Sequence, residues 1–503
     1  MAGWWLLVAV VLHGISAGVN AQEFKFDFGN GAVADGYIGI TAETVFSTGS
    51  GYGIDSGKVV GVVREGDDPL TRDYLSTDGE LFFSVAVPQG NYMVTVIFGD
   101  VDDSSSTTVT AENRRLLFDR VKTAPGMFVR KSITVRRMET RSIDGSVTMS
   151  IKDRELSYYT WDKVLTLRIT GSKPAVCGIE ITKTDDARTL FLCGNSTVVD
   201  QLDRPWSSWG QMLPDFFDSG VAVANYAESG LTSGNFLAMK RLSKLLTEVA
   251  EGDYVFVEFG HNDQKSEADV AAYPDNLKTF RDQITAKGAI PVFVTPTARQ
   301  TENDPLTSIG GLAQTMRETA RSLGVACIDL NRMVIDLKTA LGTDTKYLYM
   351  YTESDQTHFC EYGAYELARC VLKGLEEEFP SLKTHMRSDY CTFNPAEPDP
   401  LDILEKELPL AGKGNAPSPG GKRERMAVTI AGRKVCFAPL RNAPVRLVVY
   451  GINGKQLRSD PLAVSGTEAT VSSKLLSRLP PGTYILSFVQ NGVAREKFIW
   501  CRI

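Results

Sequence analysis

The stretch Thr189-Leu190-Phe191-Leu192-Cys193-Gly194-Asn195-Ser196-Thr197 joins an apolar run to a turn that carries a serine. A short apolar run that ends at a glycine is typical of a strand buried on both faces of a parallel sheet. The glycine lets the backbone turn sharply, so we expect the Ser196 hydroxyl at the end of this strand with backbone N–H groups nearby. Functional groups of open parallel sheets collect at such carboxyl ends.

The same pattern repeats along the next two hundred residues, where apolar runs alternate with helix-like stretches. This alternation predicts a parallel sheet with helices on both faces. The predicted strands are residues 189–193, 221–225, 254–259, 290–295 and 325–329, and helix-like stretches include 236–248, 274–287 and 312–323. A last predicted helix over residues 362–379 closes this α/β domain, which we place at residues 187–385.

Two β-rich regions flank the α/β domain. Residues 22–186 alternate polar and apolar side chains in short runs, which is typical of antiparallel strands and predicts a β-sandwich; the clearest runs are 24–28, 92–98, 132–135 and 164–169. Residues 386–426 are rich in Pro and Gly and are predicted to be a linker. Residues 427–503 contain two predicted hairpins, across 451–454 and across Asn491-Gly492, and are predicted to form a small second β-sandwich.

The chain has 503 residues, enough for about three domains, and a formal net charge of -7. This acidic net charge argues against a nucleic-acid partner, which would require a basic face. Its eight cysteines form no Cys-x-x-Cys pair, so the sequence does not predict a metal site. An even number of cysteines permits disulfides, but the pairing does not follow from the spacing.

Residues 1–21 have the features of an export signal. An apolar run over residues 4–11 precedes Val19-Asn20-Ala21, which offers small residues for cleavage before Gln22. The run is too short to cross a membrane, and no later segment is long and apolar enough to do so. We therefore expect an exported protein without a membrane span, at the cell surface or outside the cell, with the periplasm as the alternative. The other interpretation of the apolar run is a buried N-terminal strand.

Three further polar turns follow elements of the α/β domain. Ser229-Gly230 comes after the second predicted strand, Gly260-His261-Asn262-Asp263 after the third, and Asp355-Gln356-Thr357-His358 before the last helix. An Asp three residues before a His can hold one imidazole nitrogen while the other faces a nucleophile. Each turn by itself has a plain structural explanation, since a lone Ser196 or Asn262 is more often a helix cap. The argument rests on their occurrence together and in order.

With these turns in place, residues 189–379 resemble the SGNH (GDSL-type) hydrolase superfamily. Within it they are similar to bacterial rhamnogalacturonan acetylesterases, enzymes that remove acetyl groups from pectin. The matching segments are Leu192-Cys193-Gly194-Asn195-Ser196-Thr197, Asn225-Tyr226-Ala227-Glu228-Ser229-Gly230, Phe259-Gly260-His261-Asn262-Asp263 and Asp355-Gln356-Thr357-His358-Phe359. The resemblance implies a flavodoxin-like three-layer fold with Ser196 as nucleophile, His358 as base and Asp355 as the residue that orients the base. It also implies an oxyanion hole made by the backbone N–H groups of Ser196 and Gly230 and by the Asn262 side chain.

Two positions depart from this family pattern. Asn195 stands where most relatives have Asp, and Leu231-Thr232 stand where the acetylesterases usually carry Arg-Ser. The missing arginine is suited to binding an acidic sugar, so the resemblance implies ester hydrolysis more firmly than it implies pectin.

The function we expect is removal of acetyl groups from a plant cell-wall polysaccharide, above all rhamnogalacturonan, through an acyl-enzyme and without a metal or organic cofactor. One alternative is an esterase for acetylated xylan, another glycan or a short-chain lipid ester. The other is a catalytically inactive carbohydrate-binding protein.

The flanking regions carry resemblances of their own. Phe26-Asp27-Phe28-Gly29 with Ala34-Asp35-Gly36-Tyr37 resembles the galactose-binding-like sandwich found ahead of such esterases, which implies a carbohydrate-binding module or a wall of the active-site groove. The alternative is a purely structural domain. Asn453-Gly454-Lys455 and Leu479-Pro480-Pro481-Gly482-Thr483-Tyr484 resemble the C-terminal sorting domains of type IX secretion, which implies that secretion machinery as a partner. The alternative there is an accessory β-sandwich.

Overall fold

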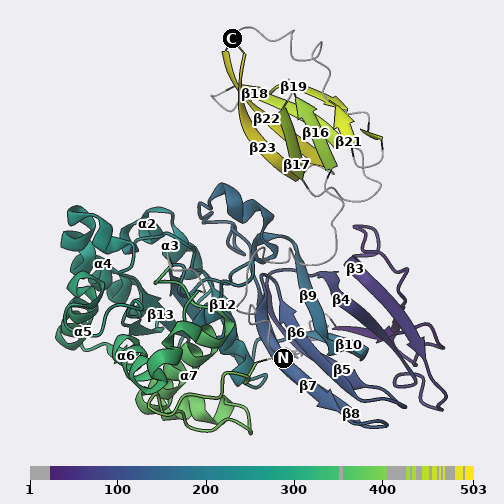
Figure 1. Ribbon diagram of the computed structural model, residues 1–503, viewed down its shortest axis with the longest axis horizontal. Helices are drawn as coiled ribbons and strands as arrows, with labels where there is room; N and C mark the ends of the chain where they lie inside the picture. Colours follow the sequence, from purple (N-terminus) through teal and green to yellow (C-terminus); the bar gives the residue numbers. More distant parts are fainter. Residues whose placement is uncertain are drawn as a thin grey trace, which may run out of the picture. The chain divides into compact units, whose positions relative to one another are not determined.

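The computed structural model describes residues 23–350 and 355–404 and, beyond residue 425, the strands between 426 and 502 (Figure 1). The chain divides into two compact units, Met1–Leu410 and Ala411–Ile503. The expected export signal over residues 1–21 lies outside the described residues. No helix in the described part of the chain is long and apolar enough to cross a membrane.

The α/β domain is built on a parallel sheet that contains all five predicted strands. These are β11 (Arg188–Gly194), β12 (Val221–Asn225), β13 (Tyr254–Glu258), β14 (Ile290–Val294) and β15 (Ala326–Ile328). They lie in the order β15-β14-β13-β11-β12, and every neighbouring pair is parallel. This is the flavodoxin-like order, in which the first strand, β11, lies between the second, β12, and the third, β13. The strand order reverses at β11. Ser196 therefore follows the strand at the point where ligands bind in such sheets.

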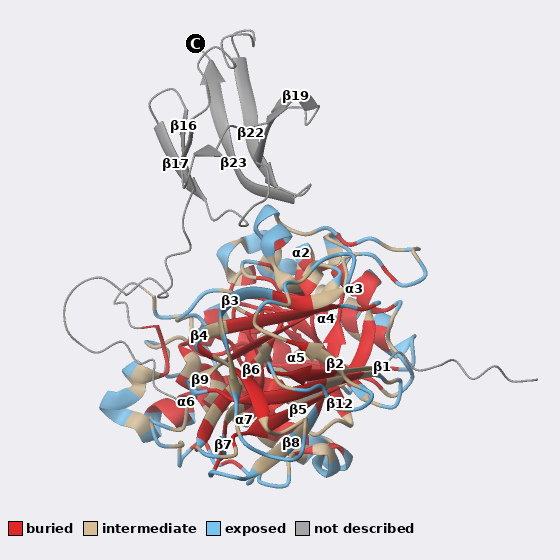
Figure 2. Ribbon diagram, turned by 90° about the vertical axis from the view of Figure 1, so that its right-hand side faces the viewer, coloured by how far each residue is buried: buried red, intermediate tan, exposed pale blue. Residues whose placement is uncertain are grey.

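Helices cover both faces of this sheet, as the alternation predicts. One layer packs on a core that includes Phe191, Val255 and Val257, and the other on a core that includes Leu192 and Phe256. The first layer contains α2 (Ser233–Ala238), α3 (Arg241–Leu245), α4 (Glu267–Thr285) and α5 (Leu312–Leu323); the second contains α1 (Trp209–Met212), α6 (Leu330–Leu341) and α7 (Glu361–Glu378). The short 3-10 helices of this domain are η3 (Leu213–Phe216), η4 (Asp263–Lys265), η5 (Ser308–Gly311), η6 (Gly342–Tyr347) and η7 (Pro380–His385). Three layers therefore enclose two separate apolar cores. In Figure 2 the strands in the middle of this unit are coloured as buried, and exposed segments lie around its margin.

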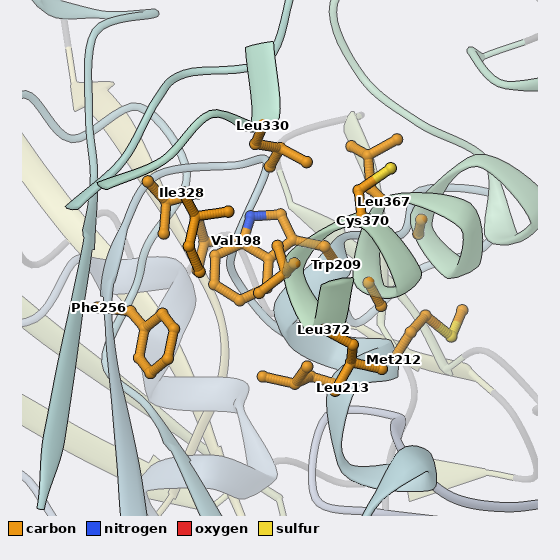
Figure 3. Close-up of a cluster of buried hydrophobic side chains, with 14 of the residues drawn as sticks. Val198, Trp209, Met212, Leu213, Phe256, Ile328, Leu330, Leu367, Cys370 and Leu372 are labelled. Carbon is orange, nitrogen blue, oxygen red and sulfur yellow. The ribbon is translucent and has the colours of Figure 1, made fainter. Parts of the chain in front are cut away.

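Trp209 is the largest fully buried side chain of the α/β domain, and its indole N–H donates to Glu258, which also contacts Thr197 in the turn that carries Ser196. Figure 3 shows its indole beside Val198, which comes two residues after Ser196, and near Leu367 and Cys370 of α7. Dense packing at this place holds the serine turn in one conformation.

Two helices differ from the expectation. The predicted helix over residues 236–248 is two short helices, α2 and α3, because Lys240 between them has a positive φ of 59° and a left-handed backbone interrupts the helix. The helix predicted to start at Pro274 begins at Glu267, where the Ser266 side chain accepts a hydrogen bond from the backbone N–H of Asp269. Pro274 lies inside α4.

The N-terminal region is antiparallel for the most part, and each of the four runs singled out in the sequence lies in a strand. Its strands follow the order β8-β5-β10-β4-β9-β6-β7, with β1, β2 and β3 at the side. Their bounds are β1 (Glu23–Phe28), β2 (Ile38–Ile40), β3 (Tyr52–Val63), β4 (Asp73–Ala86), β5 (Gly90–Gly99), β6 (Ser105–Ala111), β7 (Arg115–Thr123), β8 (Phe128–Arg137), β9 (Val164–Lys173) and β10 (Val176–Lys183). Two 3-10 helices, η1 (Asp153–Ser157) and η2 (Tyr159–Trp161), lie between β8 and β9.

The sheets of the two domains are continuous, which the sequence does not indicate. β8 pairs with β12 in parallel register, Thr134 opposite Ala222 and Val135 opposite Val223, and the result is one mixed sheet of 15 strands. Beside this junction the Arg115 guanidinium pairs with Asp200 at 2.9 Å, and both side chains are buried. The expected parallel sheet is thus one part of a larger mixed sheet.

The chain after η7 still belongs to this unit. We expected the linker to begin at residue 386, yet residues 386–404 pack on the second core, where Met386 and Phe393 are buried. Arg387 also pairs with Asp215 at 2.8 Å. Apolar side chains spaced among the prolines supply the contacts that a free linker lacks. Residues 405–425, the rest of the expected linker, lie outside the described residues.

The described strands of the C-terminal unit form two four-stranded sheets, with the orders β17-β16-β21-β20 and β19-β18-β22-β23. Both predicted hairpins are present, since β18 pairs with β19 and β22 with β23 in antiparallel register. The bounds are β16 (Met426–Ile430), β17 (Arg433–Phe437), β18 (Val445–Gly451), β19 (Gln456–Pro461), β20 (Val464–Ser465), β21 (Glu468–Thr470), β22 (Gly482–Gln490) and β23 (Val493–Arg502). The motif at residues 453–455 and the beginning of the motif at 479–484 lie outside the described residues.

Candidate active site

Ser196 lies in the turn that follows β11 and is 7% exposed. The backbone N–H groups of Val198 and Val199 both donate to the carbonyl of Asn195, which closes the turn. No helix starts at Ser196, because α1 begins only at Trp209 and is capped by Ser208. The helix-cap interpretation of Ser196 therefore does not apply.

His358 and Asp355 lie beside this serine although His358 is 162 positions away in the chain. The His358 Nε2 atom is 2.8 Å from the Ser196 Oγ atom, and its Nδ1 atom is 2.9 Å from Asp355 Oδ2. The backbone N–H groups of Thr357 and His358 also donate to Asp355 Oδ1, at 3.1 and 3.0 Å. The backbone of the Asp-x-x-His loop thus holds the Asp355 carboxylate in the position from which it contacts the His358 imidazole.

Burial by itself would raise the pKa of Asp355, but hydrogen bonds from the backbone and side chain of His358 outweigh it, and the pKa lies below the ordinary value of 3.8. Asp355 is therefore ionised at neutral pH. An ionised partner on Nδ1 keeps the imidazole proton on that nitrogen and leaves Nε2 to accept the serine proton.

Gly230 and Asn262 belong to two loops that are joined by a hydrogen bond. Gly230 has a positive φ of 78°, which favours glycine, and the Asn262 Nδ2 atom donates to the carbonyl of Leu231 at 3.1 Å. Lys265 Nζ donates to Asn262 Oδ1 at 2.7 Å. Asn262 immediately precedes η4, at the N-cap position, but its side chain makes no cap hydrogen bond. Because a carboxamide has two N–H donors, the second remains for a ligand.

The other two polar residues of the Gly260-His261-Asn262-Asp263 turn hold the turn together. Asp263 accepts from the backbone N–H and the hydroxyl of Ser233 at 2.8 and 2.6 Å, and from the N–H of Gly260 at 3.0 Å. His261 is buried, with Nε2 2.9 Å from the carbonyl of Thr297, and burial lowers its pKa to about 3. His261 is therefore neutral at pH 7.

A carboxylate that sequence reasoning missed lies beneath the serine turn. Glu258 ends β13, is fully buried, and accepts hydrogen bonds from the Thr197 hydroxyl at 2.7 Å and from the indole N–H of Trp209. Burial raises its pKa to about 7. An acidic residue in an otherwise apolar strand is the signal that would have found it.

The two departures from the family pattern have structural explanations. Asn195 Oδ1 accepts from the backbone N–H of Thr197 at 3.2 Å and lies 3.0 Å from the Thr197 hydroxyl oxygen, and an Asp carboxylate could take the same place. Leu231 is 1% exposed and packs in the first core with Phe236. Its side chain therefore contributes to packing, while the Thr232 hydroxyl caps α2.

The N-terminal domain also contacts the loop between β12 and α2, residues 226–232, which we call the Gly230 loop. No local sequence signal indicates this contact. Lys152 Nζ donates to the carbonyl of Ser229, and Arg154 forms an ion pair with Glu228. Among residues 23–350 and 355–404, no three His, Cys, Asp or Glu side chains come together in a way that could hold a metal ion.

Comparisons with known proteins give one family match for the α/β domain and another for the N-terminal domain. Residues 192–364 match the GDSL-like lipase/acylhydrolase family, and residues 24–122 match the β-agarase/YXIM esterase-like, galactose-binding domain-like family. The rhamnogalacturonan acetylesterase RhgT of Bacillus subtilis is 34% identical over 218 residues, which are 40% of this chain and 94% of that protein. The uncharacterised esterase YxiM of the same organism is 26% identical over 403 residues, 75% of this chain and 98% of its own. The crystal structure of YxiM has a TM-score of 0.38 and 24% identity, with 71% of this chain and 99% of that chain covered.

The match to RhgT extends over almost the whole of that relative at an identity that shows common family membership. The family match over residues 192–364 contains Ser196, Asp355 and His358, which meet in the α/β domain. The chain therefore belongs to the GDSL-like lipase/acylhydrolase family and is a carboxylic ester hydrolase.

Proposed function

We propose that this chain is a serine esterase that removes acetyl groups from a plant cell-wall polysaccharide, above all rhamnogalacturonan. The observation that carries the proposal is the continuous chain of contacts from Asp355 through His358 to the Ser196 hydroxyl, with 2.9 and 2.8 Å between the bonded atoms. Such a chain activates a hydroxyl that is otherwise a weak nucleophile.

The reaction proceeds in two steps. His358 Nε2 takes the Ser196 proton while the serine oxygen attacks the acetyl carbonyl carbon. The bond between that carbon and the sugar oxygen then breaks, and the same proton passes to the sugar oxygen, which leaves as a hydroxyl. This leaves an acetyl group on Ser196. A water molecule, deprotonated by His358, attacks that ester and releases acetate, and the proton returns to the serine oxygen.

Negative charge develops on the carbonyl oxygen in both steps. We assign its stabilisation to the backbone N–H groups of Ser196 and Gly230 and to the Asn262 carboxamide. Asn262 and the Gly230 loop are already held together by the bond from Asn262 to the Leu231 carbonyl, so these donors need little reorganisation.

The substrate part of the proposal is supported by the similarity to RhgT, whose name gives rhamnogalacturonan as its substrate. A panel of acetylated rhamnogalacturonan, homogalacturonan and xylan, with acetate release as the readout, tests it. We expect the highest kcat/KM on rhamnogalacturonan and no release by Ser196→Ala, which should keep the wild-type melting temperature. Faster release from xylan would contradict the substrate, and hydrolysis of p-nitrophenyl acetate by Ser196→Ala near the wild-type rate would contradict the nucleophile.

We further propose that the chain is exported and displayed at the cell surface through its C-terminal domain. The apolar run at residues 4–11 and the sorting-domain motifs of residues 453–455 and 479–484 support this proposal.

A further inference from the structure

The segment between β8 and β9 leaves the N-terminal sheet and packs on the α/β domain. Met138 and Met149 are buried in the first core of that domain, and Ser150 N–H donates to the carbonyl of Met239 at 2.9 Å. The segment thus brings η1 to the loop that contains Gly230.

A buried ion pair fixes η1 in this place. Arg241 of α3 donates to Glu155 of η1 at 2.6 Å, and both side chains are at most 1% exposed. Glu155 also accepts from the indole N–H of Trp161 at 3.1 Å and from the backbone N–H of Lys152 at 2.8 Å. The backbone of Lys152 is therefore positioned by the same carboxylate that ties η1 to the α/β domain.

From this position the Lys152 side chain lies along the Gly230 loop. Its Nζ donates to the Ser229 carbonyl, and a Cβ placed on Gly230 would lie 3.4 Å from Nζ. The loop itself rests on the end of β11, because Glu228 N–H donates to the carbonyl of Gly194 at 3.2 Å, two residues before Ser196. The ammonium group is thus next to the loop to which we assign an oxyanion donor.

The charges around Lys152 balance without it. Two carboxylates and two guanidinium groups surround it, and they pair with one another, Arg154 with Glu228 and Arg241 with Glu155. No carboxylate lies within ion-pair distance of Lys152 among the residues that the structure describes, and burial lowers its pKa from the ordinary value. An ammonium has three N–H donors, and the Ser229 carbonyl takes one. Lys152 is thus a half-buried cation with spare donors and no carboxylate within ion-pair distance, and its burial costs free energy, so a contribution to stability does not explain its position.

We propose that Lys152 is a substrate-binding residue supplied by the N-terminal domain, and that its ammonium binds a sugar carboxylate close to the ester that Ser196 attacks. This inference rests on the proposed esterase function and adds to it a preference for anionic over neutral polymers. It also makes the galactose-binding-like domain part of the substrate site.

The test compares an oligogalacturonate with its carboxyl-reduced, neutral counterpart, by calorimetric titration of the full-length chain. We expect the wild type to bind the anionic oligomer more tightly and to lose that advantage as NaCl is raised, because salt screens the pair. Lys152→Gln keeps a donor for the Ser229 carbonyl but removes the charge. It should raise the Kd of the anionic oligomer about tenfold more than that of the neutral one. Lys152→Arg should restore most of the difference.

Lys122→Gln is the matched control, because Lys122 is exposed on β7 and its substitution removes the same charge elsewhere. Equal weakening of both oligomers by Lys152→Gln, or no change in either, would overturn the inference. So would equal affinity of the wild type for the two oligomers at every salt concentration. Acetate release from acetylated polymers is measured separately. Its absence alongside the expected binding pattern would count against the proposed function and leave the role of Lys152 standing.

Discussion

Asn262 is held from two sides before any substrate arrives. Its amide nitrogen donates to the Leu231 carbonyl and its oxygen accepts from Lys265, so both the position and the rotation of the carboxamide are determined. A donor that is fixed in advance favours the transition state, because it needs no reorganisation when charge develops on the substrate.

Asn262→Ala should therefore lower kcat far more than it raises KM, by on the order of 10²- to 10³-fold. Asn276→Ala is a suitable control, since Asn276 also donates to this region, to the Ser233 hydroxyl at 3.0 Å, without a place in the proposed site. Steady-state kinetics on p-nitrophenyl acetate and a thermal melt of both variants distinguish an oxyanion donor from a purely structural residue. A purely structural Asn262 would show a lower melting temperature and a kcat within a few-fold of the wild type.

Asp355→Asn should lower kcat by on the order of 10⁴-fold while the chain stays folded, because an amide donor at this position favours the tautomer with the proton on Nε2. The wild-type carboxylate has a pKa below 3.8, so its charge is present throughout the neutral range and is lost only as the pH falls through that lowered value. Asp218→Asn is the control, since Asp218 contacts the imidazole of His385 at 3.3 Å in a second Asp–His pair. Comparable losses in both variants would argue against a special role for Asp355.

The ends of β11 and β13 are joined through buried polar groups. Gly194 pairs with Glu258 in the sheet, and the Glu258 carboxylate holds Thr197 of the serine turn. This carboxylate has a pKa of about 7 in the folded chain against an ordinary value of 4.5. Between these two pH values the folded state binds more protons than the unfolded state, so this group makes the fold less stable as the pH rises.

Glu258→Gln should remove this term. From pH 5 to pH 8 the free energy of unfolding of the variant should rise relative to that of the wild type, by up to about 3 kcal/mol. Urea unfolding of both proteins at the two pH values measures the change, and Glu43→Gln, at an exposed position, is the control for the loss of one carboxyl group. If the difference between Glu258→Gln and wild type is the same at both pH values, Glu258 does not titrate in this range.

At the scale of the whole molecule, the N-terminal domain and the α/β domain form one unit. The β8–β12 pairing closes an edge of the parallel sheet, and the Arg115–Asp200 and Arg241–Glu155 pairs bury charges from both domains. Removal of one partner from a buried pair typically costs about 3–5 kcal/mol, which is comparable to the whole stability of many domains.

A chain without residues 22–186 should therefore fail to fold, because β12 loses its neighbour and Asp200 and Arg241 lose their partners. The measurements are soluble yield and the presence of a cooperative melting transition. Soluble, active protein from residues 187–404 alone would show that the two domains are independent.

Removal of residues 427–503, by contrast, should leave the rest of the chain folded and active. These residues lie in the separate unit Ala411–Ile503, so esterase activity and the melting transition of the remainder should be unchanged. In the native host the shortened chain should no longer reach the cell surface, as cell fractionation and surface labelling would show. Normal delivery of the shortened chain would contradict the sorting proposal.

The α/β layering and the order of the polar turns were predictable from the sequence. Strands buried on both faces have a continuous apolar pattern, and β11 to β15 were found for that reason within one or two residues of their ends. The turns after β11, β12 and β13 meet because parallel strands bring their carboxyl ends to one edge, so Ser196, Gly230 and Asn262 were candidates before the fold was known. The three-residue spacing from Asp355 to His358 also indicated, independently of the strands, that Asp355 orients His358.

Only the tertiary structure decided what lies around those turns. The β8–β12 pairing, the packing of residues 386–404 and the approach of Lys152 to the Gly230 loop all depend on contacts between segments far apart in the chain. The local sequence pattern indicates which face of a helix or strand is apolar, but it does not indicate which other element packs on that face. A charged side chain such as Lys152 looks like any solvated lysine until the fold shows which charges around it are already paired.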